Sequence, residues 1–286
     1  MRVLVLGANG MLGNAVFRVL SENPNLEVLG TIRSKSSEQL FTKEIVSHLI
    51  SEIDIECEES LNKAFLKARP DIVINCVGLI KQLSSFNDPL QIIPINSILP
   101  HRLARLCEGR SRLIHISTDC VFDGLKGGYV ESDCANARDL YGMSKYLGEV
   151  SYPHSITLRT SMIGSELQSK NSLVEWFLSQ GLSCNGFTKA IFSGLPTVVL
   201  AQIIRDIIIP HNELSGVYHL AAKPISKHDL LTLIADIYDK PIQIIPDDSL
   251  VINRSLNADK FRRETGYIAP EWPSLIRTMF SYNKSS

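Results

Sequence analysis

The stretch that decides the fold lies at the start of the chain, where the apolar run of residues 2–6 leads into Gly7-Ala8-Asn9-Gly10-Met11-Leu12-Gly13. A short apolar run ending at a glycine is typical of a buried strand. Residues 11–20 carry apolar side chains at the spacing of one helix face, namely Leu12, Val16 and Leu20. The sequence therefore predicts a strand, a tight glycine-rich turn and a helix in immediate succession.

The turn has the spacing Gly-x-x-Gly-x-x-Gly. Glycines let a backbone turn tightly and approach a pyrophosphate closely, and a helix N-terminus offers free N–H groups to the anion. Because the motif lies between a predicted strand and a predicted helix, we interpret it as a dinucleotide-binding turn rather than a plain glycine turn. The residues expected to contact the cofactor here are Gly7, Asn9, Gly10, Met11 and Leu12.

Strand-like and helical segments alternate through the first half of the chain. Further strands are predicted over residues 26–32, 71–76, 113–117 and 156–159, and a helix over residues 60–68. Such alternation implies βαβ units and a parallel sheet with right-handed crossovers. We predict an α/β fold with a Rossmann-type doubly wound parallel sheet over residues 1–160, to which part of 190–220 returns. Residues 161–286 are predicted to form a smaller, discontinuous substrate-binding lobe.

Composition narrows the class of protein. The 286 residues are 44% hydrophobic and 21% charged with a formal net charge of −1, which gives no reason to expect a nucleic-acid or membrane partner. No apolar run approaches the roughly 18–20 residues that span a bilayer, and the N-terminus lacks a secretory pattern, so a cytoplasmic location is expected. The six cysteines show neither a Cys-x-x-Cys pair nor zinc spacing, which predicts free thiols and no metal.

The end of the second predicted strand indicates which dinucleotide binds. Sites that prefer NAD usually carry an acidic residue there, which binds the ribose 2′-hydroxyl. This chain places Arg33 there, followed by Ser34 and Lys35, and has no acidic residue before Glu38. Arg33 is suited to a 2′-phosphate, although a solvated basic loop is the alternative. The sequence therefore favours NADPH over NADH.

A candidate catalytic pair follows a predicted strand in the middle of the chain. Tyr141 and Lys145 stand at i, i+4, which places them on one face of a helix. A neighbouring ammonium favours the phenolate and lowers the tyrosine pKa toward the range useful for proton transfer. The preceding strand ends in Ser117-Thr118-Asp119, and ligands of doubly wound sheets bind at the carboxyl ends of strands.

These motifs together resemble the extended short-chain dehydrogenases/reductases, and most closely the dTDP-4-dehydrorhamnose reductases. The resemblance extends over nearly the whole chain, since residues 257–261 and 270–272 also match the C-terminal part of that family. It implies NADPH-dependent reduction of the 4-keto group of a nucleotide-linked 4-keto-6-deoxy sugar. The expected product class links the chain to polysaccharide biosynthesis.

The resemblance also implies roles for individual residues. Thr118 would hydrogen-bond the substrate carbonyl, Tyr141 would donate the proton to it, and Lys145 would bind the nicotinamide ribose. Asn96 matches the helix asparagine that supports the site, or is simply a polar residue at a helix start between Pro94 and Pro100. Further cofactor contacts are implied at Asp54, Ile55, Cys76, Val77 and Gly78, and substrate contacts at Thr118, Asp119, Cys120, Met162 and Arg254.

The chain departs from the family at substrate positions. The family usually has tyrosine after Thr-Asp and tryptophan after Arg-Thr-Ser, where this chain has Cys120 and Met162. Loss of two aromatic faces would change sugar packing by about 1–3 kcal/mol. Arginine usually stands directly before Leu-Asn, but here Ser255 does, with Arg254 one place earlier as either a diphosphate ligand or a surface residue. Cys120 has no suitable base nearby and is not expected to be a nucleophile.

Three alternative functions stay open. The substrate could be a UDP-linked 2-acetamido-4-keto-6-deoxy sugar, or the chain could be an epimerase or dehydratase that retains NAD. It could also be a non-catalytic NADP-binding regulatory subunit, although Thr118, Tyr141 and Lys145 are all intact. The expected partner is a small-molecule nucleotide sugar, with a homodimer as one assembly to consider.

Overall fold

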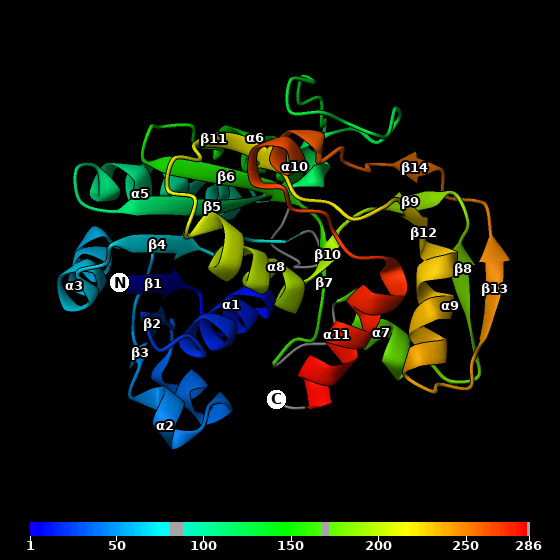
Figure 1. Ribbon diagram of the computed structural model, residues 1–286, viewed down its shortest axis with the longest axis horizontal. Coiled ribbons are helices and arrows are strands. Elements are labelled where there is room, and N and C mark those ends of the chain that lie inside the picture. The colour runs from blue at the N-terminus through cyan, green and yellow to red at the C-terminus, as the bar shows by residue number, and fades with distance from the viewer. Residues whose placement is uncertain (81–87, 168–171, 285–286) are drawn as a thin grey trace. The chain divides into compact units, whose positions relative to one another are not determined.

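The computed structural model describes residues 1–80, 88–167 and 172–284 (Figure 1). The chain divides into two compact units. The first unit comprises residues 1–117, 138–158 and 201–217, and the second comprises residues 118–137, 159–200 and 218–286. Among the described residues, no helix is both long and apolar enough to cross a bilayer, and no group of three or more His, Cys, Asp and Glu side chains is arranged to hold a metal ion.

A seven-stranded sheet in the order β11-β6-β5-β4-β1-β2-β3 organises the fold. Its strands are β1 (Arg2–Leu6), β2 (Glu27–Thr31), β3 (Leu49–Ile50), β4 (Ile72–Asn75), β5 (Arg112–Thr118), β6 (Ser155–Thr160) and β11 (Gly216–His219). The β1 strand pairs in parallel with β2 on one side and β4 on the other, so that Leu4 lies opposite both Leu29 and Val73. The order reverses at β1, and this is the switch point of a doubly wound sheet.

Several helices of the first unit bury apolar side chains on this sheet. The helical segments are α1 (Met11–Ser21), η1 (Lys35–Leu40), α2 (Lys43–Val46), α3 (Glu58–Ala68), α4 (Pro89–Ile93), η3 (Pro94–Ile98), α5 (Leu99–Cys107), α6 (Leu140–Leu147) and η5 (Ile204–Ile208). Leu61 of α3 and Leu103 of α5 join a core cluster with Leu4, Leu6 and Val73. Since strand side chains alternate, Val3 and Val5 face the opposite side of the sheet. Strands buried on both faces explain their continuous apolar sequence.

The second unit is built from shorter elements. Its strands are β7 (Met162–Ile163), β8 (Ser183–Phe187), β9 (Ala190–Phe192), β10 (Leu195–Pro196), β12 (Ile225–Ser226), β13 (Gln243–Asp247) and β14 (Ile252–Asn253). Its helical segments are η4 (Asp119–Val121), α7 (Leu173–Ser179), α9 (Lys227–Ile237), α10 (Asp259–Thr265) and α11 (Trp272–Lys284), while α8 (Thr197–Ile203) continues into the first unit. Small sheets pair β10 with β7, β13 with β8, and β9 with both β12 and β14.

The predicted doubly wound fold is confirmed, and β1, β2, β4, β5 and β6 lie within one or two residues of the strands predicted in the sequence analysis, whereas β3 was not predicted. The predicted first domain includes residues 118–137 and 159–160, which belong to the second of the two units. The segment 118–137 leaves β5 and pairs with a C-terminal stretch through a bridge between Tyr129 and Leu256. The return to the first unit occurs at residues 201–217, within the predicted segment 190–220.

Candidate active site

The glycine turn behind β1 is built for close backbone approach. Gly7 has a φ of +81°, in the left-handed region that favours glycine. The N–H of Gly10 donates to the carbonyl oxygen of Gly7 at 3.0 Å, and Gly10 is the N-cap residue of α1. A β-carbon at Gly13 would lie 2.0 Å from the Gly7 carbonyl oxygen, so only glycine fits there. The turn therefore requires glycine at both ends of the motif, at positions 7 and 13.

The N-terminus of α1 is suited to an anion. Gly10 is exposed and Met11 is half-buried, so the first turn is accessible, while Leu12 is buried in the core. The first turn of α1 contains no acidic residue, and Gly10 leaves the N-terminal N–H groups without a side-chain cap. Free N–H groups together with the helix dipole favour a phosphate at this position. Asn9 is half-buried in the same turn.

The loop after β2 presents Arg33 to solvent, and Ser34 caps η1 by accepting the N–H of Ser36 at 3.2 Å. Glu38, the first acidic side chain after this strand, accepts a hydrogen bond from the hydroxyl of Ser51. The carboxylate of Glu38 is therefore hydrogen-bonded to the loop that follows β3. An exposed arginine with no competing carboxylate at the strand end is the arrangement that suits a 2′-phosphate.

The adenine-side candidates lie in the turn before α3. Asp54 is exposed, and its Oδ1 accepts the N–H of Glu56 at 3.0 Å. The N–H of Asp54 donates to the hydroxyl of Ser60 at 2.9 Å. Ile55 is half-buried and packs against the core cluster. The structure thus orders this turn internally and leaves the Asp54 side chain accessible.

Asn96 connects the chain after β4 to α6. Its Oδ1 accepts the N–H of Leu79 at 2.9 Å, and its Nδ2 donates to the Leu79 carbonyl oxygen at 3.1 Å and to the Ser144 hydroxyl at 3.2 Å. Asn96 is buried within η3, a π-helical segment continuous with α4 and α5, and so does not stand at a helix start. A β-carbon on Gly78 would lie 3.4 Å from Asn96 Oδ1 and 3.7 Å from Lys145 Nζ.

The same end of β4 carries Cys76 and Val77. The N–H of Cys76 donates to the carbonyl oxygen of Leu6 on β1 at 3.2 Å, and the N–H of Val77 donates to Asn75 Oδ1 at 3.1 Å. Burial raises the pKa of the Cys76 thiol to about 12, so this thiol is protonated at neutral pH. Cys76 and Val77 therefore contribute shape and apolar surface rather than charge.

Tyr141 and Lys145 lie one turn apart on α6. Asp139 begins this helix, since its side chain accepts the N–H of Gly142 at 2.9 Å. Lys145 is 5% exposed, and its Nζ donates to the carbonyl oxygen of Ile116 on β5 at 2.7 Å. Burial lowers the pKa of Lys145 to about 8. A lysine of this pKa is still mostly protonated at pH 7, and Tyr141 is half-buried beside it on the same helix face.

In the second unit, Thr118 and Asp119 are buried at the point where β5 passes into η4. The Thr118 hydroxyl donates to Asp119 Oδ1 at 3.2 Å and accepts the N–H of Cys120 at 3.1 Å. Burial raises the pKa of Asp119, and the positive charge of Arg254 opposes that rise. Nε of Arg254 donates to the carbonyl oxygen of Phe122 at 2.8 Å. Asp119, one of the predicted substrate residues, thus interacts electrostatically with Arg254.

Met162 opens β7 and pairs in register with Leu195 of β10. It is half-buried, as is Cys120. All six cysteines are free of disulfide bonds, as the sequence predicts. In the first unit the structure brings together Gly78, Asn96 and Lys145, and in the second it brings together Thr118, Asp119, Cys120 and Arg254.

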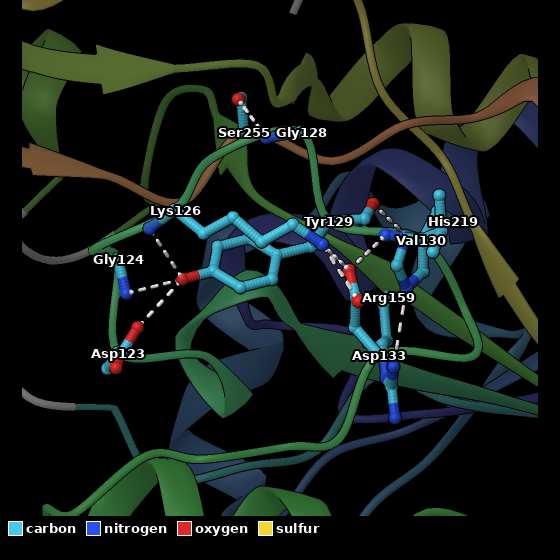
Figure 2. Close-up of polar contacts among 10 residues, drawn as sticks. All are labelled: Asp123, Gly124, Lys126, Gly128, Tyr129, Val130, Asp133, Arg159, His219 and Ser255. Atoms are coloured by element: carbon cyan, nitrogen blue, oxygen red, sulfur yellow. Dashed lines mark hydrogen bonds and ion pairs between the residues drawn. The ribbon is translucent and has the colours of Figure 1, made fainter.

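The loop after Phe122 is held by a tyrosine hydroxyl that the sequence reasoning did not identify. The Tyr129 hydroxyl donates to Asp123 Oδ1 at 2.7 Å and accepts the N–H groups of Gly124 at 3.2 Å and Lys126 at 3.1 Å (Figure 2). The Tyr129 ring also stacks on Phe122, with ring centroids 4.1 Å apart. This side chain fixes the segment that follows Thr118 and Asp119.

A buried arginine–histidine pair lies next to that loop and was also missed. Arg159 is 4% exposed, and its Nη1 donates to Nε2 of His219 at 3.3 Å. Because an arginine only donates, the neutral ring of His219 carries its proton on Nδ1, which donates to the Tyr129 carbonyl oxygen at 3.0 Å. Burial lowers the pKa of His219 to about 4. Residues 159 and 219 are far apart in the sequence and form no short motif, so the spacing of residues along the chain could not predict the pair.

The chain can be compared with known proteins. A dTDP-4-dehydrorhamnose reductase of Aggregatibacter actinomycetemcomitans is 26% identical, with 98% of this chain and 99% of the relative covered. Methionine adenosyltransferase 2 subunit beta of Danio rerio is 26% identical over 84% of this chain and 75% of the relative. The crystal structure of dTDP-4-dehydrorhamnose reductase from Bacillus anthracis in complex with NADP superposes with a TM-score of 0.78, at 22% identity, over 98% of this chain and 99% of that one.

The doubly wound sheet, the glycine turn after β1 and the Tyr141–Lys145 pair on α6 define an extended short-chain dehydrogenase/reductase. Within that class, the chain belongs to the family described as the RmlD substrate binding domain, which matches residues 1–280. The resemblance seen in the sequence is therefore confirmed at the level of the family and the fold.

Proposed function

We propose that this protein reduces the 4-keto group of a nucleotide-linked 4-keto-6-deoxy sugar with NADPH as the reductant. The observation that carries the proposal is the buried Lys145, whose Nζ is held on β5 one helical turn from Tyr141. Short-chain reductases need this arrangement to deliver a proton at neutral pH. Relatives named dTDP-4-dehydrorhamnose reductase support the sugar class.

Tyr141 is proposed as the proton donor to the carbonyl oxygen of the substrate. The ammonium of Lys145 stabilises the phenolate that forms, and it also binds the nicotinamide ribose. Thr118 hydrogen-bonds the same carbonyl oxygen and so orients it. NADPH, when bound, supplies the hydride that completes the reduction.

The residues present fit the cofactor because the turn between Gly7 and Gly13 is closely packed and has no room for a β-carbon on Gly13. Met11 and Leu12 are proposed to bind the pyrophosphate with their backbone N–H groups, and Gly10 is proposed to contact it through a backbone that carries no side chain. The remaining proposed cofactor contacts are Asn9, Arg33, Asp54, Ile55, Cys76, Val77, Gly78 and Asn96. The NADP complex of the Bacillus anthracis protein supports this choice of dinucleotide.

The substrate contacts are proposed at Asp119, Cys120, Met162 and Arg254, with Arg254 on the diphosphate. Cys120 and Met162 stand where the family usually has tyrosine and tryptophan, so sugar recognition is proposed to differ in detail from that of a dTDP-4-dehydrorhamnose reductase. A UDP-linked 2-acetamido-4-keto-6-deoxy sugar is the alternative substrate. Dehydratases of this superfamily typically carry glutamate after Thr-Asp to drive elimination, and Cys120 cannot replace that carboxylate, which disfavours elimination chemistry.

The test is NADPH oxidation against freshly generated dTDP- and UDP-linked 4-keto-6-deoxy sugars. The Tyr141→Phe variant should lower kcat at least about 100-fold while NADPH still binds, since general acid catalysis contributes about 10²–10⁴-fold. Tyr146→Phe, an exposed position on the same helix, is the matched control and should leave kcat unchanged. Near wild-type turnover in Tyr141→Phe would overturn the proposed proton donor.

Two results would direct attention to the other candidates. Stoichiometric NAD in the purified protein, detected by absorbance at 260 nm after denaturation, would favour an epimerase or dehydratase that retains its cofactor. NADPH binding without turnover of any sugar would favour a regulatory subunit, and the likeness to a protein named as a subunit, methionine adenosyltransferase 2 subunit beta, supports this candidate.

A further inference from the structure

Lys145 and Glu149 are anchored on neighbouring residues of one strand. Nζ of Lys145 donates to the carbonyl oxygen of Ile116 at 2.7 Å, and the hydroxyl of Ser117 donates to Oε1 of Glu149 at 2.7 Å. Ile116 and Ser117 are consecutive in β5. The strand therefore fixes the cation and the carboxylate at the same end of the sheet.

Glu149 lies just after α6, and its backbone is still hydrogen-bonded to the helix. Its N–H donates to the carbonyl oxygen of Tyr146 at 3.1 Å, just beyond the C-cap residue Gly148. Gly148 is closely packed, since a β-carbon there would lie 1.9 Å from the carbonyl oxygen of Asn96. This contact holds the end of α6 in place. Glu149 is half-buried, and its charge acts on Lys145, where it raises the lysine pKa against the effect of burial.

The charge balance around Lys145 depends on Glu149. Burial is the main effect that lowers the pKa of Lys145, and Glu149 is the strongest opposing influence. Among the residues that the structure describes, the other titratable groups beside the lysine are Cys76 at the end of β4, His115 on β5 and Tyr141 on α6. The Cys76 thiol has a pKa of about 12, and burial lowers the pKa of His115 well below its ordinary value, so both are neutral at pH 7. Glu149 therefore supplies the counter-charge.

We propose that Glu149 is a positioning residue of the reductase site, which keeps Lys145 protonated and fixed on β5 for its work beside Tyr141. The catalytic role of Glu149 rests on the proposed function, whereas its effect on the protonation of Lys145 does not. Glu149 acts through Lys145 and needs no contact with substrate. Tyr141, Lys145 and Glu149 stand at i, i+4 and i+8, so the three form one extended motif.

Glu149→Gln keeps the shape and the Ser117 hydrogen bond but removes the charge. Lys145 then carries the cost of burial without its counter-charge, so its pKa is expected to fall from about 8 by roughly one unit, toward neutral pH. The alkaline limb of the kcat profile should move to lower pH by the same amount, so that kcat falls about 10-fold at pH 9. KM for the sugar should change little.

The experiment measures the pKa of Lys145 directly in the intact protein. Lysines labelled with ¹³C at Cε are titrated by NMR, and the Lys145 resonance is assigned by its absence in Lys145→Met. Glu149→Gln is compared with Glu59→Gln, which removes an exposed carboxylate from α3. A lowered lysine pKa in Glu149→Gln alone, with restoration in Glu149→Asp, is the expected result.

An unchanged Lys145 pKa in folded Glu149→Gln would overturn the proposal. If circular dichroism shows that this variant does not fold, Ser117→Ala provides the test, because it releases the carboxylate without removing it. A smaller fall of the lysine pKa is expected there, and no fall would equally overturn the proposal. The titration needs no turnover, so a failed reductase assay would contradict the proposed function and leave this inference standing.

Discussion

Gly13 and Gly7 contact each other backbone to backbone across the turn behind β1, where a β-carbon on Gly13 would lie 2.0 Å from the Gly7 carbonyl oxygen. The contact places the first turn of α1 directly against the end of the strand. It thereby sets the position of the free N–H groups that are proposed to bind a pyrophosphate. A substituent at residue 13 must separate the helix from the strand.

Gly13→Ala should therefore lower both stability and cofactor binding. We expect a loss of about 2 kcal/mol or more in the free energy of unfolding, as for an overpacked core, together with at least 10-fold weaker NADPH binding. Urea unfolding and fluorescence titration with NADPH measure the two effects. Gly181→Ala is the control, since a β-carbon there meets nothing within 4 Å. Wild-type NADPH affinity in Gly13→Ala would contradict the assignment of the turn.

Arg33→Ala should change cofactor preference rather than chemistry. Loss of a charge-assisted contact to the 2′-phosphate costs about 1.5–3 kcal/mol, so kcat/KM for NADPH should fall about 10- to 100-fold. The value for NADH, which lacks that phosphate, should change less than threefold. Lys35→Ala, in the same exposed segment, is the comparison. Equal losses with both cofactors would show that Arg33 does not read the 2′-phosphate.

Lys145→Met should stabilise the protein at neutral pH while it abolishes reduction. The pKa of Lys145 is lowered to about 8 in the folded protein but is ordinary in the unfolded chain. Below pH 8 the wild type therefore bears the full cost of burying the ammonium, about 3 kcal/mol, and this cost disappears as pH rises toward 10.5. The variant also loses the favourable contacts of the lysine, which offsets part of its gain in stability. The stability advantage of Lys145→Met should shrink between pH 8 and 10. Urea midpoints across this range measure it, and a constant difference would contradict the buried charge.

His219→Gln should reduce acid sensitivity. Because the folded-state pKa of His219 is lowered to about 4, its stabilising contribution is complete above pH 6.5 and is lost as pH falls toward 4. The wild type should lose about 3 kcal/mol more than the variant between pH 7 and pH 4. Denaturant unfolding at both pH values is the measurement. Parallel losses in the two proteins would place the acid sensitivity elsewhere.

Periodicity predicted the sheet well because strands buried on both faces read as continuous apolar runs, as in residues 71–76. The turn at Gly7 and the pair Tyr141 and Lys145 were visible because each depends on spacing within one short segment. Whether they bind cofactor or substrate stays a prediction. The family resemblance supplied the remaining candidates, among them Asn96, whose side chain makes three hydrogen bonds.

Other features were not predictable from local patterns. The partners Arg159 and His219 are 60 residues apart, and only the folded chain brings them together. Residues 118–137 look like a continuation of the first domain, yet their backbone pairs near Leu256. Glu149 did have a signal, the i+8 spacing from Tyr141, but a single glutamate at that spacing is common on helix surfaces. Burial and the Ser117 hydrogen bond distinguish it.

The division of the chain has a consequence for synthesis. The peptide passes between the two units at residues 117/118, 137/138, 158/159, 200/201 and 217/218. Neither unit is complete until β11 has left the ribosome, and this strand forms one edge of the large sheet. A nascent chain that stops before residue 216 exposes the unpaired side of β6, which invites association with other strands. Expression of residues 1–160 alone should therefore give aggregates rather than an isolated nucleotide-binding domain.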